Sequence, residues 1–421
     1  MRIAMMTNNY KPFIGGVPIS IERLSEGLSE LGHDVYIFAP RYDNIGYGNV
    51  KEQGVIRYKS IKKRKSSKRT YAIPNVIDRH IENKFRELDI DIIHVHHPVL
   101  IGNMAVHLGK KYSIPVVFTY HTRYEEYLHN IPGYCAIEKD YRNRENGIIH
   151  SVEEEIINMS KKKIVPSYLR NFANKCDMII APTKLMEEYL DEVGIKSSIK
   201  IIPTGLKADQ FKINSLKIKT IREGYSQNKR YLFCTVSRLS EEKNIEFMID
   251  GLKKLKKYIG NNFNMLIIGD GPLKEKLIKK VKKNGLEENI TFLNSIPNEE
   301  IKNYYGACDL FLFSSKSETQ GIVLIEAMAM RVPIVAIKAS GVIDVVKNNV
   351  NGYMTEDDID DWVQKITLAL NSKENMKSLK RGAYETAKEY LNINIAKTVA
   401  ENYRKLTYKA DCIHGKRDKI I

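Results

Sequence analysis

Two carboxylates bracket a glycine turn in the segment SETQGIVLIEAMA, residues 317–329. Glu318 stands before Gly321, and Glu326 lies inside a run that favours a helix. Backbone N–H groups at a helix start attract an anionic ligand, and a carboxylate among apolar residues needs a hydrogen-bond donor, which a ligand hydroxyl can supply. One interpretation is therefore a ligand site. The other is structural, with Glu318 complementing the helix dipole and Glu326 in a salt bridge.

Two cations follow a predicted strand in the segment VSRLSEEKN, residues 236–244. Arg238 and Lys243 stand at the carboxyl end of this strand, where parallel sheets bind their ligands. Arginine binds a diphosphate as a fork and lysine binds it as a point charge. We therefore expect both cations to face an anionic ligand. The alternative is surface pairing with Glu241 and Glu242.

Glycine turns follow two other predicted strands. Gly15 and Gly16 come after the first strand and allow the backbone to approach a phosphate closely. They lack the full G-x-G-x-x-G pattern, so the pair alone does not identify a nucleotide site. Residues 269–272 (GDGP) resemble them in position and mainly indicate a turn before a helix.

Histidines gather after two further apolar runs. His121 directly follows VVFTY and is a candidate for contact with a reacting centre. His94 and His96 would share one face of a strand, and together with His97 they raise the question of a metal site. No acidic residue has a suitable spacing, so we expect packed or ligand-lining histidines and no metal site.

Short apolar runs alternate with longer amphipathic stretches along the chain. Runs such as residues 3–6, 92–95 and 232–236 are mostly apolar and do not alternate between apolar and polar residues, which is typical of parallel strands buried on both faces. Stretches such as residues 19–31 and 244–258 carry apolar residues at helical spacing. This alternation of strand and helix predicts an α/β fold.

A polar, lysine-rich stretch at residues 207–230 separates two halves of similar size. Each half has its own βαβ series, so we predict two doubly wound, Rossmann-like domains that face a cleft. The predicted domains are residues 1–205 and 206–391. They are followed at 392–421 by a helix, expected to reach residue 408, and a loose polar tail.

The bulk composition excludes several classes of protein. The chain has 421 residues, of which 43% are hydrophobic and 28% are charged, which excludes a disordered or collagen-like chain. No apolar run approaches the roughly 20 residues of a membrane-spanning helix, and the start of the chain does not resemble a signal peptide. The five cysteines form no C-x-x-C pair, which argues against a zinc or thioredoxin-type site and suits a reducing compartment.

The net charge is +16, from 67 basic and 51 acidic residues. Such a charge favours polyanionic partners, although many lysines fall on what look like solvated helix faces.

Residues 59–69 are basic without an acid and precede apolar residues at helical spacing between 76 and 88. A basic loop feeding an amphipathic helix can dock on an anionic membrane. The alternative is a core-packed helix with a solvated loop. Nucleic acid is not expected, because no aromatic residues interleave the run. The membrane-binding candidates are Lys62, Lys63, Arg64, Lys65, Lys68 and Arg69.

Taken together, Gly15-Gly16, HTRYEEY, SRLSEEKN, GDGP and the E-x7-E pair resemble the retaining glycosyltransferases of the large family that includes sucrose synthase and bacterial mannosyltransferases. The resemblance spans residues 1 to about 400. It implies the GT-B fold, with a C-terminal helix that packs back on the first domain, and a nucleotide sugar held mostly by the second domain. No Asp-x-Asp metal motif stands out in the sequence, so we expect no required divalent ion, and we expect no cofactor.

The same resemblance implies a role for each matching residue, with catalysis depending on His121, Arg238, Lys243 and Glu318. Arg238 and Lys243 would bind the donor diphosphate, and His121 would lie beside the anomeric carbon. Glu318 would hold the sugar hydroxyls and Glu326 the ribose. The other residues implied to bind the substrate are Gly16, Ile296, Thr319, Gln320, Gly321 and Ile322.

Four longer segments, DIIHVHHPVLIGNMA, IPVVFTYHTRYEEYLHNIPG, YLRNFANKCDMIIAPT and IIPTG, look like the diacylglycerol glucosyltransferases of low-GC Gram-positive bacteria. This likeness implies transfer of glucose from UDP-glucose to the 3-hydroxyl of diacylglycerol, with retention. It also implies a cytoplasmic protein on the inner face of the membrane, whose first domain binds the acceptor. Two departures, the long stretch 133–166 and Lys207 where that family often has Asp, leave open a soluble glycosyltransferase that acts on a saccharide or protein in cell-surface polymer assembly. A binding protein on a degenerate scaffold is disfavoured because the donor residues are intact.

Overall fold

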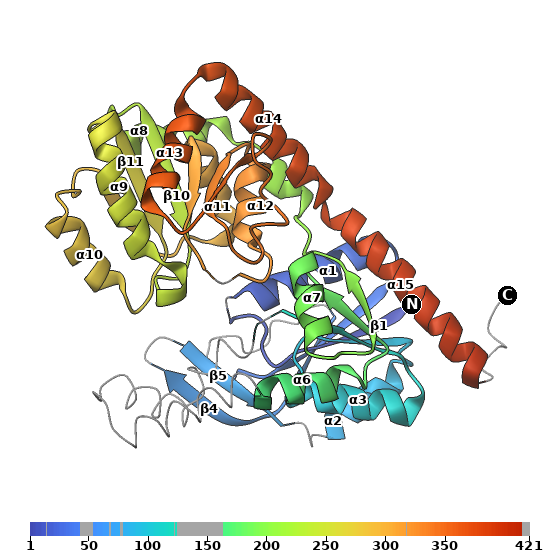
Figure 1. Ribbon diagram of the computed structural model, residues 1–421. Coiled ribbons are helices and arrows are strands. Elements are labelled where there is room, and N and C mark those ends of the chain that lie inside the picture. Colours follow the sequence, from blue (N-terminus) through green and yellow to red (C-terminus); the bar gives the residue numbers. More distant parts are fainter. Residues whose placement is uncertain are drawn as a thin grey trace. The chain divides into compact units, whose positions relative to one another are not determined.

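The computed structural model divides the chain into two compact units (Figure 1). Unit 1 is Met1–Pro203 with Ile395–Ile421, and unit 2 is Thr204–Asn394. In the described part of the chain, no helix combines the length and apolar character that crossing a bilayer requires. The described residues are 1–13, 15–42, 54–66, 69–75, 79–121, 123, 163–316 and 318–414.

Unit 1 is built on a seven-stranded parallel sheet in the order β3-β2-β1-β6-β7-β8-β9. Its strands are short and mostly buried, as their continuous apolar runs predict. The strands are β1 Arg2–Met6, β2 Asp34–Pro40, β3 Val55–Tyr58, β6 Ile92–Val95, β7 Val116–Thr119, β8 Met178–Ala181 and β9 Ser198–Ile201. The helices are α1 Gly16–Glu30, α2 Arg79–Glu87, α3 Ile101–Tyr112, α6 Val165–Ala173 and α7 Lys184–Glu192.

Alternate residues of strand β1 pack into two separate hydrophobic cores of unit 1. Ala4 and Met6 pack with buried residues of α2, α3, α6 and α7. Ile3 and Met5 pack with buried residues of α1 and of the last helix, α15 (Asn392–His414). Both faces of the sheet are therefore covered, which is the physical reason for its uninterrupted apolar strands.

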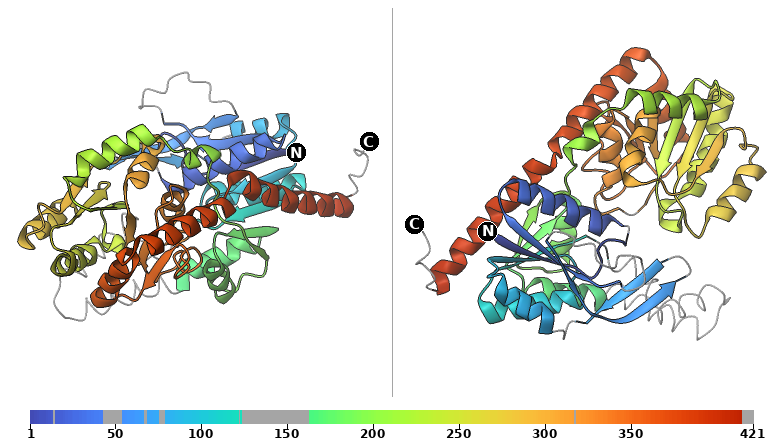
Figure 2. Two further views of the ribbon diagram at one scale, coloured as in Figure 1. Left: turned by 90° about the horizontal axis from the view of Figure 1, so that it is seen from above. Right: turned by 180° about the vertical axis from the view of Figure 1, so that it is seen from behind.

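Helix α15 confirms that the C-terminal segment packs back on the first unit (Figure 1, Figure 2). Ala396, Val399, Ala400 and Tyr403 recur at helical spacing and are buried there. The expected end at residue 408 is wrong, because the helix continues to His414. No proline or glycine interrupts it over this length, so nothing in the backbone stops it earlier.

Unit 2 has a six-stranded parallel sheet in the order β12-β11-β10-β13-β14-β15. The sheet is again covered on both faces by apolar clusters. Its strands are β10 Tyr231–Val236, β11 Phe263–Ile268, β12 Ile290–Leu293, β13 Leu310–Phe313, β14 Ile334–Ile337 and β15 Gly352–Thr355. Its helices are α8 Ser215–Ser226, α9 Ile245–Ile259, α10 Lys274–Lys283, α11 Asn298–Ala307, α12 Ile322–Ala329, α13 Ile359–Leu370 and α14 Lys373–Glu389, with short 3-10 turns at Ala208–Phe211 and Glu241–Lys243.

The strand order of each sheet reverses at one point. In unit 1 the reversal lies between β1 and β6, and in unit 2 it lies between β10 and β13. Ligands of doubly wound sheets bind outside the carboxyl ends of the strands at such a point. A ligand site is therefore expected at the segments that follow these four strands.

The basic segment differs from the expected loop. Residues Ser60–Ser66 form β4, which pairs antiparallel with β5 (Arg69–Pro74). The β-branched and aromatic residues of RTYAIP favour this pairing, which satisfies the backbone groups of the lysine-rich strand. Lys68 and residues 76–78 lie outside the described residues.

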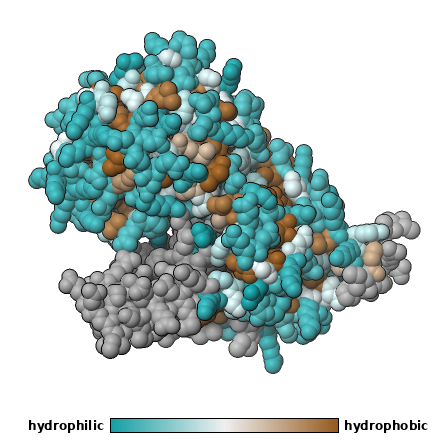
Figure 3. Space-filling view, in the orientation of Figure 1, coloured by the Kyte–Doolittle hydropathy of each residue, from teal (hydrophilic) through white to brown (hydrophobic). Residues whose placement is uncertain are grey.

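The amphipathic helix after the basic segment is α2, and its apolar side faces the interior of unit 1. Ile81 and Phe85 are buried in the same core as β1 and β6. The core-packed alternative therefore describes this helix, and its buried side chains do not form a membrane-facing surface. On the face shown in Figure 3, hydrophilic side chains cover most of the described surface, which fits solvated lysine-rich helices.

Candidate functional site

The loop after β10 is held by the turn after β11. Gly269 and Gly271 lie against the backbone of Ser237 and Leu239, and a Cβ at either glycine would come within 2.3 Å of a carbonyl oxygen there. The backbone N–H of Leu239 also donates to Asp270 O at 3.1 Å. The GDGP turn therefore positions the loop that carries Arg238, which explains its glycines without a ligand.

Arg238 lies at the carboxyl end of β10 and forms an ion pair with a residue of its own loop. Its Nη2 donates to Glu242 Oε1 at 2.6 Å, and its Nε donates to Ser240 Oγ at 3.1 Å. Burial acts to raise the pKa of Glu242, but the hydrogen bonds from Ser240 and Arg238 outweigh it, and this pKa is lowered. Glu242 therefore stays ionised and fixes the guanidinium at the strand end.

Lys243 connects the motif that carries it with the motif of Glu318, and these two motifs are distant in the sequence. Its Nζ lies 2.5 Å from Glu318 Oε1, and the side chains are 15% and 18% exposed respectively. The loops also meet through backbone groups, since the hydroxyl of Ser314 donates to Lys243 O at 2.9 Å and Lys316 N donates to Glu242 O at 3.1 Å. The segments after β10 and β13 thus form one half-buried polar site at the strand reversal of unit 2.

Helix α12 begins beside this site. Its N-cap is Gly321, whose φ of +68° lies in the left-handed region that favours glycine. Ile322, the first helical residue, is half-buried. The first N–H groups of a helix lack partners within the helix and can bind an anion.

Glu326 lies one turn further along α12 and is 7% exposed. The hydroxyl of Tyr305 on α11 donates to its Oε2 at 3.3 Å. The chain therefore supplies a neutral donor to a carboxylate that its apolar neighbours would otherwise penalise.

Among the other residues expected to bind the substrate in unit 2, the side chain of Gln320 forms hydrogen bonds within the protein. Its Oε1 accepts from Thr204 N at 2.8 Å, and its Nε2 donates to Thr204 O at 3.0 Å. Thr319 is half-buried in the same loop. Ile296 follows β12, packs against the apolar core of unit 2 and lines a cavity of about 590 Å³ together with residues of α8 and α11.

The glycine pair of unit 1 lies at the start of α1. A Cβ at Gly15 would come within 3.0 Å of the Phe13 ring, whereas a Cβ at Gly16 would meet no heavy atom within 4 Å in the described structure. Packing therefore does not require a glycine at position 16, and close approach of a ligand remains its proposed reason.

Four histidines lie together at the carboxyl ends of β6 and β7. His94 and His96 have ring centroids 4.2 Å apart, and His96 stacks on His121 at 5.1 Å. His96 Nδ1 lies 2.9 Å from His121 Nε2, so one of these nitrogens carries the hydrogen that joins the rings. His97 Nδ1 lies 3.2 Å from both Thr7 Oγ1 and Asn8 N.

Burial keeps these histidines neutral. It lowers the pKa of His94 to about 3 and that of His97 to about 4. Burial, followed by the neighbouring histidines, lowers the pKa of His96 and of His121 well below the usual value. His121, which is partly exposed, can therefore offer an uncharged ring to a ligand at neutral pH.

His94 links the sheet of unit 1 to the C-terminal helix. Its Nε2 lies 2.6 Å from Thr119 Oγ1, and its Nδ1 lies 2.6 Å from the hydroxyl of Tyr403. A neutral imidazole has one donor and one acceptor, and both are used here. In the described part of the chain, no group of three or more His, Cys, Asp or Glu side chains could hold a metal ion.

Sequence reasoning missed three contacts around the expected residues. The partnership of His96 with His121, the contact of Tyr403 with His94 and the clamp of Gln320 on Thr204 each join distant segments. Only the burial of Tyr403 has a sequence signal, because this residue falls on the apolar side of its helix.

Comparison with known proteins gives consistent matches over both units. The family "Glycosyl transferases group 1" matches residues 217–386, and "Glycosyltransferase Family 4" matches residues 14–210. The chain is 26% identical to an alpha-monoglucosyldiacylglycerol synthase of Acholeplasma laidlawii, over 97% of this chain and 98% of that protein. It is 25% identical to the protein of that name in Streptococcus pneumoniae, over 96% and 85%. The crystal structure of Anabaena Alr3699/HepE in complex with UDP has a TM-score of 0.73 at 17% identity, covering 96% of this chain and 100% of that one.

Proposed function

The chain belongs to the group 1 glycosyltransferases with the GT-B fold, and we propose that it transfers a hexose from a UDP-sugar to a lipid hydroxyl with retention. The proposed donor is UDP-glucose and the proposed acceptor is the 3-hydroxyl of 1,2-diacylglycerol. The observation that carries the proposal is the meeting of Lys243 with Glu318 beside the start of α12. Two relatives named for monoglucosyldiacylglycerol synthesis, and HepE structures with UDP and UDP-glucose, support the substrate classes.

The donor site follows from the charges of unit 2. Arg238 and Lys243 would neutralise the diphosphate, and the N–H groups at Gly321 and Ile322 would contact its oxygens. When the sugar–phosphate bond breaks, negative charge grows on the leaving phosphate, and fixed cations stabilise it without reorganising. Glu318 would hold the sugar hydroxyls while it keeps Lys243 in place.

Glu326 and Ile296 would complete this site on the nucleoside side. The buried Glu326 carboxylate already accepts from Tyr305 and can accept from a ribose hydroxyl as well. Ile296 would flank the base.

In the proposed transfer, the proton lost by the acceptor hydroxyl is taken up by the leaving group. The bond from the anomeric carbon to the leaving phosphate breaks, and a bond from that carbon to the acceptor oxygen forms on the same face. The acceptor hydroxyl gives its proton to the departing phosphate, which carries the developing negative charge. His121 would contact the sugar as a neutral ring held through His96, and Gly16 would let the backbone of unit 1 approach the diphosphate.

We propose that the β4–β5 hairpin holds the protein on the inner, cytoplasmic face of the membrane, as a peripheral protein. Its basic residues would face anionic lipid, each contributing on the order of 1 kcal/mol near the surface. Replacing Lys62, Lys63, Arg64 and Lys65 by Ser should weaken binding to anionic vesicles and reduce its salt dependence. Turnover of detergent-solubilised acceptor should persist, whereas equal loss in both assays would assign these residues to folding or chemistry.

The direct test is transfer from UDP-[14C]glucose to diacylglycerol in anionic vesicles. The expected product is a labelled, lipid-soluble glycoside with the α configuration at its anomeric carbon. Label in a saccharide or protein acceptor without lipid would favour the soluble glycosyltransferase instead. The absence of product with any diacylglycerol, from a protein that still binds UDP, would refute the lipid acceptor.

A further inference from the structure

We propose that unit 2 has a second ligand site, which binds a phosphate-bearing organic anion at the opposite end of the strands from the proposed donor site. The site is a cavity of about 1100 Å³ where the amino ends of three central strands face α14. Tyr231 begins β10 and Arg230 directly precedes it, Asp309 precedes β13, and Arg331 precedes β14. Strand β10 has six residues and separates the cavity from the Arg238 loop by about 20 Å.

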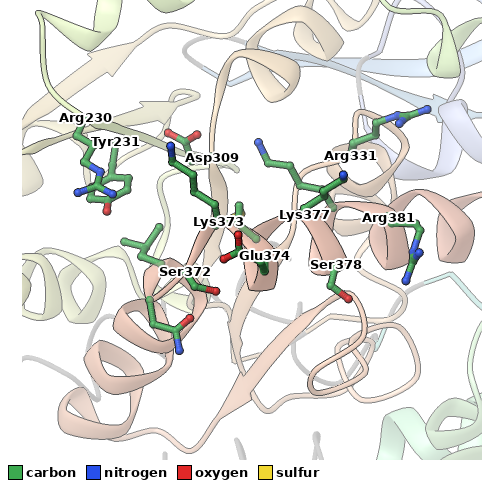
Figure 4. A pocket seen from close by; sticks show the side chains of 14 residues that line it. Arg230, Tyr231, Asp309, Arg331, Ser372, Lys373, Glu374, Lys377, Ser378 and Arg381 are labelled. Atoms are coloured by element: carbon green, nitrogen blue, oxygen red, sulfur yellow. The ribbon is translucent and has the colours of Figure 1, made fainter.

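The cavity is rich in cations. Six basic side chains and two acids line it (Figure 4). Arg230 lies on one side and Arg331 and Arg381 lie on the other, with Lys373 and Lys377 between them. The sixth cation is Lys380.

The acids compensate little of this charge. Asp309 accepts from Arg222, outside the cavity lining, at 2.9 Å and from Leu232 N at 2.9 Å. Glu374 is the other acid. Within the described ranges of the chain, none of the six cations forms an ion pair with a carboxylate. The cavity therefore carries positive charge that the protein itself leaves unbalanced.

The cations on α14 lower the stability of this helix. Lys373, Lys377 and Arg381 follow one another at intervals of four residues, which places like charges side by side on one face. Lys373 also stands at the start of the helix, where a cation opposes the dipole. The opposite face contributes the buried Leu379 and Ala383, so folding does not require these cations.

Two of the three arginines of the cavity, Arg230 and Arg331, lie over aromatic rings. The guanidinium of Arg230 lies 5.0 Å from the ring centroid of Tyr231, and that of Arg331 lies 4.4 Å from the ring centroid of Tyr384. Such stacking fixes the planar forks that bind phosphate in a bidentate manner.

The size and the apolar lining of the cavity define the class of ligand. Its volume is that of a small-molecule site and exceeds what a single inorganic anion fills. Tyr231, Leu370 and Met376 add apolar surface to the cationic lining. The lining therefore fits a phosphate attached to an organic group, either as a soluble phosphorylated compound or as a lipid headgroup with its glycerol and acyl carbons.

The test is calorimetric titration of the full chain with two soluble probes, inorganic pyrophosphate and dihexanoyl phosphatidylglycerol below its micelle concentration. The site variant combines Lys373→Gln, Lys377→Gln and Arg381→Gln. The control combines Lys279→Gln, Lys282→Gln and Lys283→Gln on α10, which remove the same charge from exposed positions outside the cavity.

We expect saturable binding of at least one probe, at least tenfold weaker in the site variant and within twofold of wild type in the control. The Lys243→Met variant should retain the binding that the site variant loses, because Lys243 belongs to the donor site and does not line the cavity. Binding of pyrophosphate would show that the phosphate part of a soluble phosphorylated compound is recognised, and binding of the short lipid alone would identify a headgroup. Without ligand, the site variant should unfold at the same or a higher urea concentration than wild type, because repulsion between like charges is removed.

Three results would overturn the proposal: no saturable binding of either probe, equal loss in the site variant and the control, or loss in Lys243→Met with binding intact in the site variant. The last would place the bound probe in the donor site. None of these results depends on glycosyl transfer, so they leave the proposed function to its own test.

Discussion

The buried histidines of unit 1 should make this unit sensitive to mild acid. His94 and His97 have pKa values of about 3 and about 4 in the fold, against 6.5 for an ordinary histidine. Because the folded values are lowered, the unfolded chain binds protons more readily, and stability is lost as the pH falls below 6.5. At pH 5 the unfolded rings are protonated and the folded ones are not. The gap of 1.5 pH units costs about 2 kcal/mol per histidine, or about 4 kcal/mol for the pair.

Hydrogen exchange of peptides from β6 and β7 at pH 7.5 and pH 5 measures this loss in unit 1, after correction for the intrinsic exchange rate. The only tryptophan, Trp362, lies in unit 2, so its fluorescence during urea unfolding reports on the other unit. The His94→Gln variant should lose about 2 kcal/mol of the pH dependence, while His107→Gln, which removes an exposed histidine of α3, should keep all of it. A change below about 1 kcal/mol in wild type, or an unchanged pH dependence in His94→Gln, would refute the reasoning.

Three further changes test contacts described above. Lys243→Met should lower kcat/KM for the UDP-sugar by about 100-fold or more, because Glu318 loses its partner and the leaving phosphate loses a fixed cation. Gly251→Ala should destabilise unit 2 by about 1–3 kcal/mol in urea unfolding, since the added Cβ would lie 2.6 Å from the Trp362 ring. Tyr403→Phe should increase hydrogen exchange of α15 relative to wild type, because it removes the hydroxyl that bonds a buried histidine.

Each of these changes has a matched control. Lys316→Met removes a more exposed lysine of the same site loop and should leave kcat/KM within a few-fold of wild type. Gly224→Ala adds a methyl group in α8 where no atom lies within 4 Å, and it should stabilise unit 2 slightly. Tyr408→Phe alters an exposed tyrosine of α15 and should leave exchange unchanged. Equal effects in a variant and its control would contradict the corresponding contact.

The parallel sheets were predictable because most of their strands are largely apolar and do not alternate with polar residues. Residues 92–95 and 232–236 are strands, as expected, and the segments after β10 and β13 meet because both strands flank the reversal of one sheet. The β4 strand was not predictable in the same way, because its lysine-rich sequence lacks an apolar run and its pairing depends on β5. The end of α15 had a signal in Gly415, since glycine commonly follows the last residue of a helix.

The partners of the site residues were the least predictable part. Gln320 lies 116 residues from Thr204, and His94 lies 309 residues from Tyr403. Propensity and periodicity describe only near neighbours along the chain, whereas these contacts depend on how complete elements pack. Sequence reasoning could therefore nominate Glu318 and Lys243 separately, but their contact at 2.5 Å required the fold.

The return of α15 to unit 1 has a consequence for biosynthesis. Most of unit 1 leaves the ribosome before unit 2, yet unit 1 is completed by residues that follow the whole of unit 2. At roughly 5–20 residues per second, the 191 residues of unit 2 delay that completion by roughly 10–40 s. During this interval Ile3 and Met5 lack the covering side chains of Ala396 and Val399. The nascent first half is therefore the stage at which a chaperone should bind, and a stop codon before residue 395 would leave it permanently uncovered.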